Sequence, residues 1–168
     1  GLEFFCGMDF GYVNDPTALI WGWYDKGQRR ILVTGEYFAK GMNNRDIANV
    51  LTQLGLRKEC ITADSSEPKS IEELKELGIP RIRGAKKGKY SVLYGISWIN
   101  SHHLVVDERC KGLREEMENY TWKRDKQGDG YENVPIDTFN HGIDALRYGL
   151  EHRMQRQGMQ IWKERSEG

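Results

Sequence analysis

Three apolar segments, rich in aromatic and β-branched residues, open the chain and follow one another closely: residues 3–10, 17–25 and 30–38. The stretches between them, 11–16 and 25–28, contain Gly, Asp, Asn and Pro, which favour turns. Strands joined by short turns pair in an antiparallel manner, because a parallel pair needs a long crossover connection. The opening of the chain therefore predicts an antiparallel three-strand meander whose first strand is buried.

After this meander, helical and strand patterns alternate. Apolar residues recur at helical spacing in several segments, and short β-branched runs lie between them. The predicted helices start near Asn43 and Pro68 and cover 90–99, 110–120 and a final segment marked by Ile143, Leu146, Leu150 and Met154, while the predicted strands are 59–63, 81–83 and 104–107. Strand-helix-strand crossovers imply parallel pairing. The expected fold is α/β, a mixed sheet of three antiparallel strands followed by parallel strands, with flanking helices.

Two further segments complete this outline. Residues 121–135 surround the turn sequence Gln-Gly-Asp-Gly and predict an extra β-hairpin before the last helix. Residues 158–168 are polar, and we expect a frayed C-terminal tail there, with a single domain over 1–157.

Composition narrows the functional classes. The chain has 168 residues, of which 38% are hydrophobic and 30% charged, which suits one compact domain with a core of its own. Its 25 basic residues equal its 25 acidic residues, so any contact with nucleic acid must come from a local patch. We find no apolar run of membrane-spanning length and no signal pattern, and expect an intracellular protein. The three widely spaced cysteines predict reduced core thiols.

Three aspartates stand where an element ends or begins. Asp9 and Asp64 each close a short apolar run, and Asp144 lies one turn into the final helix. Each one alone is typical of a turn or a helix cap. Together they match the order of elements in the ribonuclease H-like fold, which this chain resembles and whose active-site acids stand on the first strand, the adjacent fourth strand and a late helix. Three carboxylates in one place would suit hard divalent cations and phosphodiester hydrolysis.

His141 precedes Asp144 by three residues, so on a helix both side chains share one face. This alignment predicts that His141 reaches the same site. It could transfer a proton near neutral pH or bind a metal directly, and the sequence leaves both roles open. By contrast, His102 and His103 point to opposite sides of an extended segment, and we expect them at the surface or at an edge.

Two local groups of basic residues could follow a DNA backbone. The first lies in a glycine-flanked loop and consists of Arg83, Lys86, Lys87 and Lys89, with Arg81 just before it. The second, Lys123 and Arg124, lies on the predicted hairpin. Both are predicted to bind phosphate groups. A solvated loop and an exposed charged hairpin would have the same composition, and these alternatives remain open.

Four motifs carry a narrower resemblance: Gly-Met-Asp-Phe-Gly, Ala-Asp-Ser-Ser-Glu-Pro-Lys-Ser-Ile, Lys-Lys-Gly-Lys and Asn-His-Gly-Ile-Asp-Ala-Leu-Arg-Tyr. Over residues 3 to 153 the chain resembles the C-terminal nuclease domain of the large terminase subunit of tailed, headful-packaging bacteriophages. The resemblance implies a metal-dependent endonuclease that cuts concatemeric double-stranded viral DNA when packaging starts and ends. Two Mn²⁺ or Mg²⁺ ions would be held by Asp9, Asp64 and Asp144, with His141 assisting.

The same resemblance implies partners and a location. An ATPase motor domain absent from this chain would precede it in the full-length protein, which would also work with a small terminase subunit and a portal. We expect the isolated domain to be monomeric and the protein to act in the host cell cytoplasm. The alternatives are a junction resolvase or transposase-like nuclease of the same fold, and a non-catalytic module that holds DNA or docks the motor.

Overall fold

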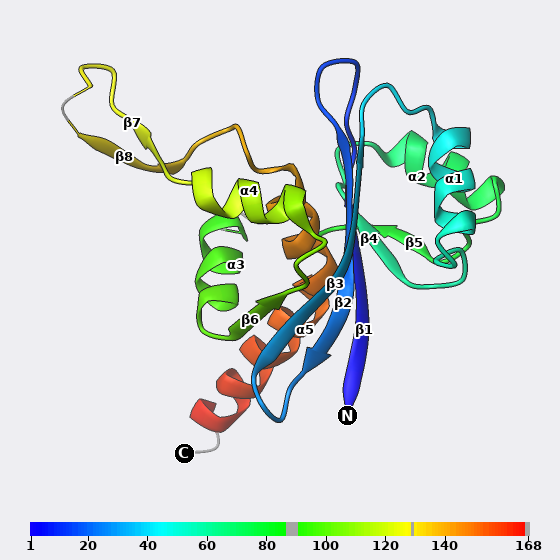
Figure 1. Ribbon diagram of the computed structural model, residues 1–168. Coiled ribbons are helices and arrows are strands. Elements are labelled where there is room, and N and C mark those ends of the chain that lie inside the picture. Colours follow the sequence, from blue (N-terminus) through cyan, green and yellow to red (C-terminus); the bar gives the residue numbers. More distant parts are fainter. Residues whose placement is uncertain (87–90, 129, 167–168) are drawn as a thin grey trace.

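The computed structural model describes the backbone of residues 1–86, 91–128 and 130–166, and the side chains within these ranges except those of 133 and 155–166. The strands are β1 Leu2–Asp9, β2 Thr17–Asp25, β3 Arg30–Ala39, β4 Ile61–Ala63, β5 Ile82–Gly84, β6 His103–Val106, β7 Trp122–Arg124 and β8 Tyr131–Pro135. The helices are α1 Asn44–Gln53, α2 Pro68–Glu76, α3 Ser91–Asn100, α4 Lys111–Asn119 and α5 His141–Ser166 (Figure 1).

The main sheet has six strands in the order β5-β4-β1-β2-β3-β6. The pairs β1–β2 and β2–β3 are antiparallel, as the short turns predict. Strands β4, β5 and β6 join in parallel, each after a helical crossover, as predicted. Because β1 pairs with β2 on one side and β4 on the other, its C-terminal end lies in the middle of the sheet. The predicted mixed sheet is therefore confirmed.

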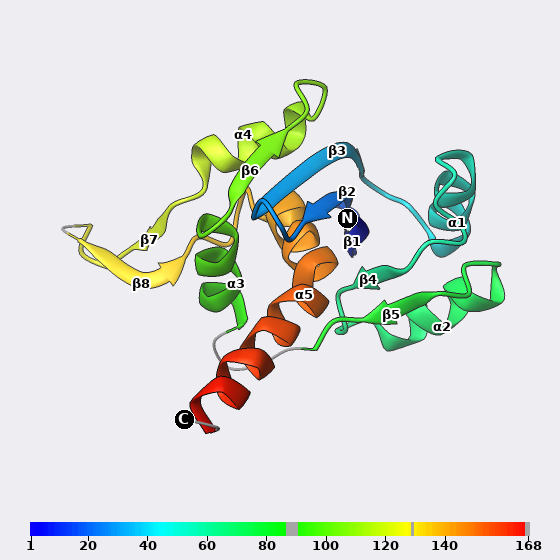
Figure 2. The same cartoon turned by 90° about the horizontal axis from the view of Figure 1, so that it is seen from below.

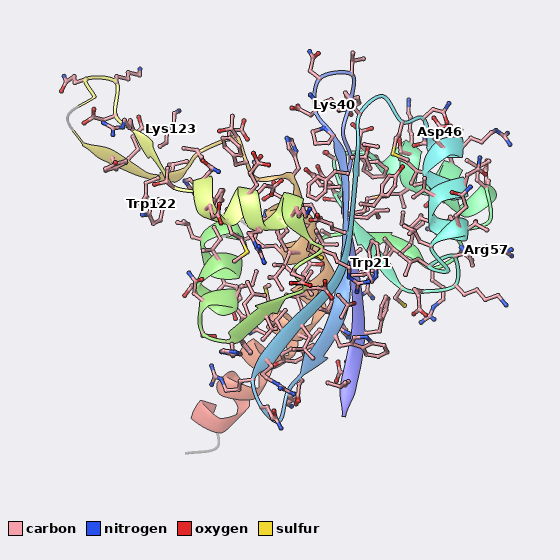
Figure 3. All side chains as sticks on the ribbon, viewed as in Figure 1. Trp21, Lys40, Asp46, Arg57, Trp122 and Lys123 are labelled. Carbon is pink, nitrogen blue, oxygen red and sulfur yellow. The ribbon has the colours of Figure 1, made fainter. Side chains whose placement is uncertain are left out.

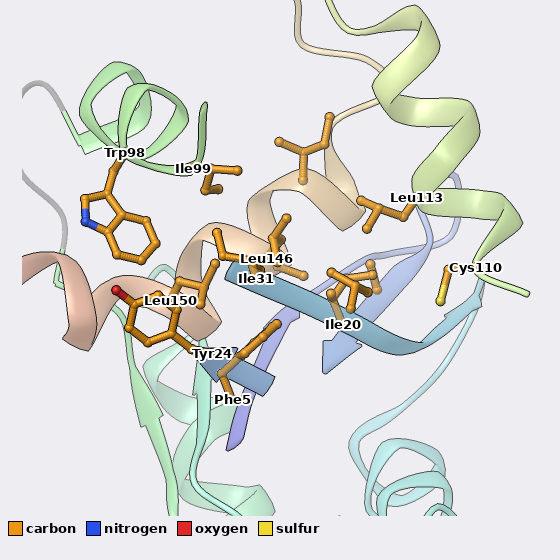
Figure 4. Close-up of a cluster of buried hydrophobic side chains, with 14 of the residues drawn as sticks. Phe5, Ile20, Tyr24, Ile31, Trp98, Ile99, Cys110, Leu113, Leu146 and Leu150 are labelled. Atoms are coloured by element: carbon orange, nitrogen blue, oxygen red, sulfur yellow. The ribbon is translucent and has the colours of Figure 1, made fainter. Parts of the chain in front are cut away.

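Helices cover both faces of the sheet (Figures 1 and 2). On one face, α1 and α2 pack through Ile47, Leu51 and Leu74 against Cys6 and Met8 of β1. On the other face, α3, α4 and α5 pack against side chains that point to the opposite side of the sheet from Cys6 and Met8. That second cluster includes Phe5, Ile20, Tyr24, Ile31, Trp98, Ile99, Leu113, Leu146 and Leu150 (Figure 4). The alternation of side chains along β1 thus separates the two halves of the core.

Strand β1 and helix α5 meet backbone to backbone. A Cβ atom added to Gly7 would lie 1.7 Å from the carbonyl oxygen of Ala145 and 2.6 Å from the amide nitrogen of Gly149. Any side chain at position 7 would collide with the helix. The absence of a side chain at Gly7 therefore lets the first turns of α5 lie directly on the strand that ends at Asp9.

Local signals explain where the helices begin and end. Asn43 and Asp46 form a reciprocal capping box at the start of α1, and Gly55 beyond its end has a φ of +75°, which favours glycine. Helix α5 differs from our expectation, because it continues to Ser166 instead of ending near residue 157. Gly158 is the only strong helix-weakening residue in that stretch, and one glycine costs about 1 kcal/mol, which a helix tolerates.

The predicted hairpin is confirmed as the separate two-stranded sheet β7–β8. It projects away from the main body, with Trp122 and Lys123 at its base (Figures 1 and 3). Our expectation for His102 was wrong. Its side chain is buried, with Nδ1 2.8 Å from the carbonyl oxygen of Trp98 and Nε2 3.3 Å from the hydroxyl of Tyr24. His102 is buried because it packs beside Trp98 and Tyr24, two members of the cluster on this face of the sheet.

Candidate active site

The carboxyl ends of β1 and β4 bring two of the predicted aspartates to the same edge of the sheet. Asp9 is the last residue of β1 and is 8% exposed. Asp64 directly follows β4, and its backbone N–H donates to the carbonyl oxygen of Met8 over 3.1 Å. The parallel register, which pairs Met8 with Ala63, therefore places Asp64 beside Asp9.

The start of α5 supplies the other two residues. His141 is the first residue of this helix, and its Nδ1 lies 3.2 Å from Oδ2 of Asp9. Its Nε2 lies 3.5 Å from Oδ1 of Asp15, an exposed residue in the loop between β1 and β2. Asp144 lies one turn further along the helix, on the same face. Sequence reasoning did not find Asp15, because a loop aspartate carries no periodic signal that links it to a distant helix.

The electrostatics indicate that the three carboxylates share one site. Burial raises the pKa of Asp9 to about 7, and the negative charges of Asp144 and Asp64 add to this effect while His141 opposes it. Burial also raises the pKa of Asp144, with Arg147 opposing and Asp64 adding. The pKa of Tyr148, raised mainly by burial, is raised further by all three aspartates. Carboxylates that repel one another in this way favour a nearby cation.

Two of the carboxylates are nevertheless engaged by protein groups. Asp64 accepts hydrogen bonds from the backbone N–H and the hydroxyl of Ser66, at 3.0 and 2.8 Å. Asp144 accepts a hydrogen bond from Nη2 of Arg147 at 2.9 Å. Within the part of the chain that the structure describes, no three His, Cys, Asp or Glu side chains are arranged to hold a metal ion as they stand. Their oxygen donors suit Mg²⁺ or Mn²⁺, and the hydrogen bonds from Ser66 and Arg147 would compete with such an ion for Asp64 and Asp144.

A buried glutamate that sequence reasoning missed anchors the start of α5. Glu116 of α4 is 6% exposed and accepts hydrogen bonds from the backbone N–H groups of Gly142 and Ile143, at 3.0 and 2.9 Å. Burial raises the pKa of Glu116, and these two hydrogen bonds oppose that shift. A carboxylate is favourable at a helix N-terminus because the first N–H groups have no partner within the helix. Glu116 thereby holds the helix turn that carries His141 and Asp144.

A second carboxylate anchors α4 in the same manner. Glu36 of β3 accepts hydrogen bonds from the N–H groups of Gly112 and Leu113, at 2.8 and 2.7 Å. The sheet therefore holds α4 through Glu36, and α4 holds α5 through Glu116. One signal was available in the sequence, since Glu116 falls three residues after Leu113 on the apolar stripe of its helix, where a carboxylate needs a partner.

The predicted DNA-binding residues fall in two places. Arg83 lies on the edge strand β5, beside β4, and Nε of Arg83 donates to the hydroxyl of Thr62 over 3.2 Å. Lys86 is exposed, and its backbone N–H donates to the carboxylate of Glu151. Lys87 and Lys89 lie outside the described residues.

The other two basic residues lie on the projecting hairpin. Nζ of Lys123 lies 3.9 Å from a carboxylate oxygen of Glu132. The guanidinium of Arg124 lies 5.4 Å from the centre of the Tyr131 ring. Both side chains are exposed and are held only by surface contacts, which are weak in water. This position leaves them accessible to a large anionic ligand.

Comparison with known proteins agrees with this arrangement. A family model described as "Terminase RNAseH like domain" matches residues 9–152. The chain is 38% identical over 159 residues to the large terminase subunit of Bacillus phage SPP1. The aligned region covers 93% of this chain and 37% of that protein. The chain thus spans little more than a third of that relative.

Solved structures are similar as well. The nuclease domain of the SPP1 large terminase with bound Mn has a TM-score of 0.82 and 38% identity, covering 90% of this chain and 86% of that one. The large terminase nuclease of thermophilic phage G20c with bound magnesium has a TM-score of 0.61 and 15% identity, over 89% and 81%. The second likeness shows the fold alone. The predicted ribonuclease H-like fold is confirmed, and the chain belongs to the family of terminase RNase H-like nuclease domains.

Proposed function

We propose that this chain is a metal-dependent DNA endonuclease that cuts concatemeric viral double-stranded DNA when genome packaging starts and ends. One observation carries the proposal. Burial, together with the charges of Asp144 and Asp64, raises the pKa of Asp9 to about 7, and His141 contacts Asp9 directly. The nuclease domain of the SPP1 large terminase, which was solved with bound Mn, supports the same chemistry.

The residues have distinct roles in this proposal. Two Mn²⁺ or Mg²⁺ ions, when bound, would neutralise the phosphodiester and activate water. Asp9, Asp64 and Asp144 would hold these ions through their carboxylate oxygens. His141 holds the Asp9 carboxylate through Nδ1, and its Nε2, which lies 3.5 Å from Oδ1 of Asp15, would serve in proton transfer.

Substrate and partners follow from the same family. Arg83, Lys86, Lys87 and Lys89 would contact one stretch of the phosphate backbone, and Lys123 and Arg124 on the hairpin another. In a full-length terminase, the ATPase domain, the small subunit and the portal would deliver DNA to this site. The expected setting is the host cell cytoplasm. Among the described residues, no helix is long and apolar enough to cross a membrane.

The test is linearisation of supercoiled plasmid by the purified chain with Mn²⁺, Mg²⁺, Ca²⁺ or a chelator. We expect cleavage with Mn²⁺ or Mg²⁺ that is lost in chelator and in Asp144→Ala. A folded protein that does not cut DNA with any of these metals would instead favour a non-catalytic module that holds DNA or docks the motor. Cleavage confined to branched DNA by a dimer would favour a junction resolvase of the same fold.

A further inference from the structure

A buried arginine stands against the candidate metal site. Arg147 lies one turn after Asp144 on α5 and is 7% exposed. Its Nη2 donates to Oδ1 of Asp144 over 2.9 Å. A guanidinium keeps its charge at every physiological pH, so this is a permanent positive charge in contact with a carboxylate of the site.

The packing around Arg147 fixes where that charge lies. Its guanidinium carbon is 5.2 Å from the centre of the Tyr148 ring. Its aliphatic part lies on Gly95 of α3, where an added Cβ atom would come within 2.9 Å of the arginine Cδ. Gly95 of α3 and the ring of Tyr148 thus pack against the side chain of Arg147.

The bond between Arg147 and Asp144 is also incomplete. Nε of Arg147 is buried and has no hydrogen-bond partner among the described residues. Arg147 therefore holds Oδ1 of Asp144 through a single nitrogen, without the two parallel bonds of a full arginine-carboxylate pair, while Oδ2 of Asp144 lies 3.5 Å from Nδ2 of Asn140. A single bond is more easily broken when a stronger cation approaches.

We propose, on the basis of the proposed metal-dependent function, that Arg147 is a positioning residue that acts as the internal counter-ion of the site. Without metal it holds Asp144 and offsets the repulsion among the three aspartates. A divalent ion at Asp144 would compete with Arg147 for that carboxylate and would lie near the positive charge of Arg147. Arg147 therefore lowers the affinity of the site for its ions.

The test is the dissociation constant of Mn²⁺, measured without DNA by calorimetry or electron paramagnetic resonance, in wild type and Arg147→Met. Methionine keeps most of the apolar length and removes the charge. We expect Mn²⁺ to bind Arg147→Met about tenfold more tightly, the scale by which groups behind metal ligands change affinity. Arg147→Lys, which keeps a positive charge, should stay within about threefold of wild type.

Arg153→Met is the matched control. Arg153 lies on the same helix and pairs with Glu3 through a 3.3 Å contact at the opposite end of β1 from Asp9, so its removal should leave Mn²⁺ affinity unchanged. Circular dichroism checks that each variant is folded, and Arg147→Gln replaces the methionine variant if that one does not fold. Unchanged or weaker Mn²⁺ binding in a folded neutral variant overturns the counter-ion role alone. If wild type binds no Mn²⁺ that depends on Asp144, the proposed metal-dependent function fails as well.

Discussion

Nδ1 of His141 lies 3.2 Å from Oδ2 of Asp9, although 132 residues separate them in the chain. The contact leaves Nε2 directed toward Asp15, 3.5 Å from its Oδ1. In the proposed function, His141 would position Asp9 through one nitrogen and transfer a proton through the other.

Replacing His141 by Asn keeps a polar group near Asp9 and removes the titratable ring. We expect cleavage to fall by about 100-fold or more, the usual contribution of a general acid or base. Mn²⁺ affinity should change by less than about threefold, because the carboxylates remain. Plasmid cleavage rates and Mn²⁺ titration check both parts. A parallel loss of metal affinity and rate would instead identify His141 as a metal ligand.

The raised pKa of Asp9 predicts how the stability of the metal-free protein depends on pH. Its pKa is about 7 in the folded state and near 4 in an unfolded chain, so the folded state retains a proton between these values. This contribution to the free energy of unfolding is complete below pH of about 4 and is lost as pH rises through about 7. Thermal melts in chelator should show this decline, and Asp9→Asn should reduce it. Glu118→Gln, at an exposed position, should leave the decline as in wild type.

Removal of the Glu116 carboxylate should loosen the start of α5. Glu116→Ala leaves two buried N–H groups without their acceptor, and we expect a loss of about 1–2 kcal/mol in the free energy of unfolding. Urea denaturation measures this loss. Glu115→Ala, one residue earlier and exposed, should change stability by less than about 0.5 kcal/mol. Equal effects of the two substitutions would contradict the anchoring role.

The close approach at Gly7 predicts that even one methyl group is too large there. Gly7→Ala would push the added carbon into the carbonyl oxygen of Ala145, so we expect destabilisation of at least about 1–3 kcal/mol. The matched change Gly27→Ala meets only a side-chain oxygen of Asp25 at 3.5 Å and should be nearly neutral. Thermal melts of the two variants distinguish a specific collision from a general intolerance of alanine.

The hairpin should contribute to DNA affinity through charge alone. In the double variant of Lys123→Ala and Arg124→Ala, DNA binding should weaken for every sequence, and the slope of its salt dependence should fall by about one for each phosphate that the variant no longer neutralises. Fluorescence anisotropy across a salt series measures both effects. Lys26→Ala, in the β2–β3 turn at the opposite end of the molecule, is the control (Figure 1). An unchanged slope in the double variant would mean that the hairpin does not bind DNA.

The sequence predicts the parts of this molecule that depend on local pattern. Alternation along residues 3–10 gives β1 and its two buried faces, and short turns give the antiparallel meander. The ends of β1 and β4 and the first turn of α5 are visible as local boundaries, which is why Asp9, Asp64 and Asp144 could be named as candidates.

The remaining features depend on contacts between distant segments. Glu116 reaches the start of α5, Asp15 reaches His141, and His102 contacts Tyr24 of β2, and each of these pairs is far apart in the sequence. Arg147 illustrates the same limit. The sequence shows that Arg147 follows Asp144 by three residues. It does not show that Arg147 is buried against Gly95, because this contact forms only when α3 packs on α5.

Helix α4 precedes the β7–β8 hairpin and α5 follows it. The hydrogen bonds that Glu116 accepts from Gly142 and Ile143 join these two helices. A further bond, from the N–H of Ile136 to the carbonyl oxygen of Thr121 at 2.9 Å, closes the base of the hairpin itself. The segment between α4 and α5 is thus a projecting hairpin whose two ends are joined by hydrogen bonds at its base. We expect that the hairpin can be shortened, lengthened or replaced without displacing His141, so its length can vary while the start of α5 stays in place.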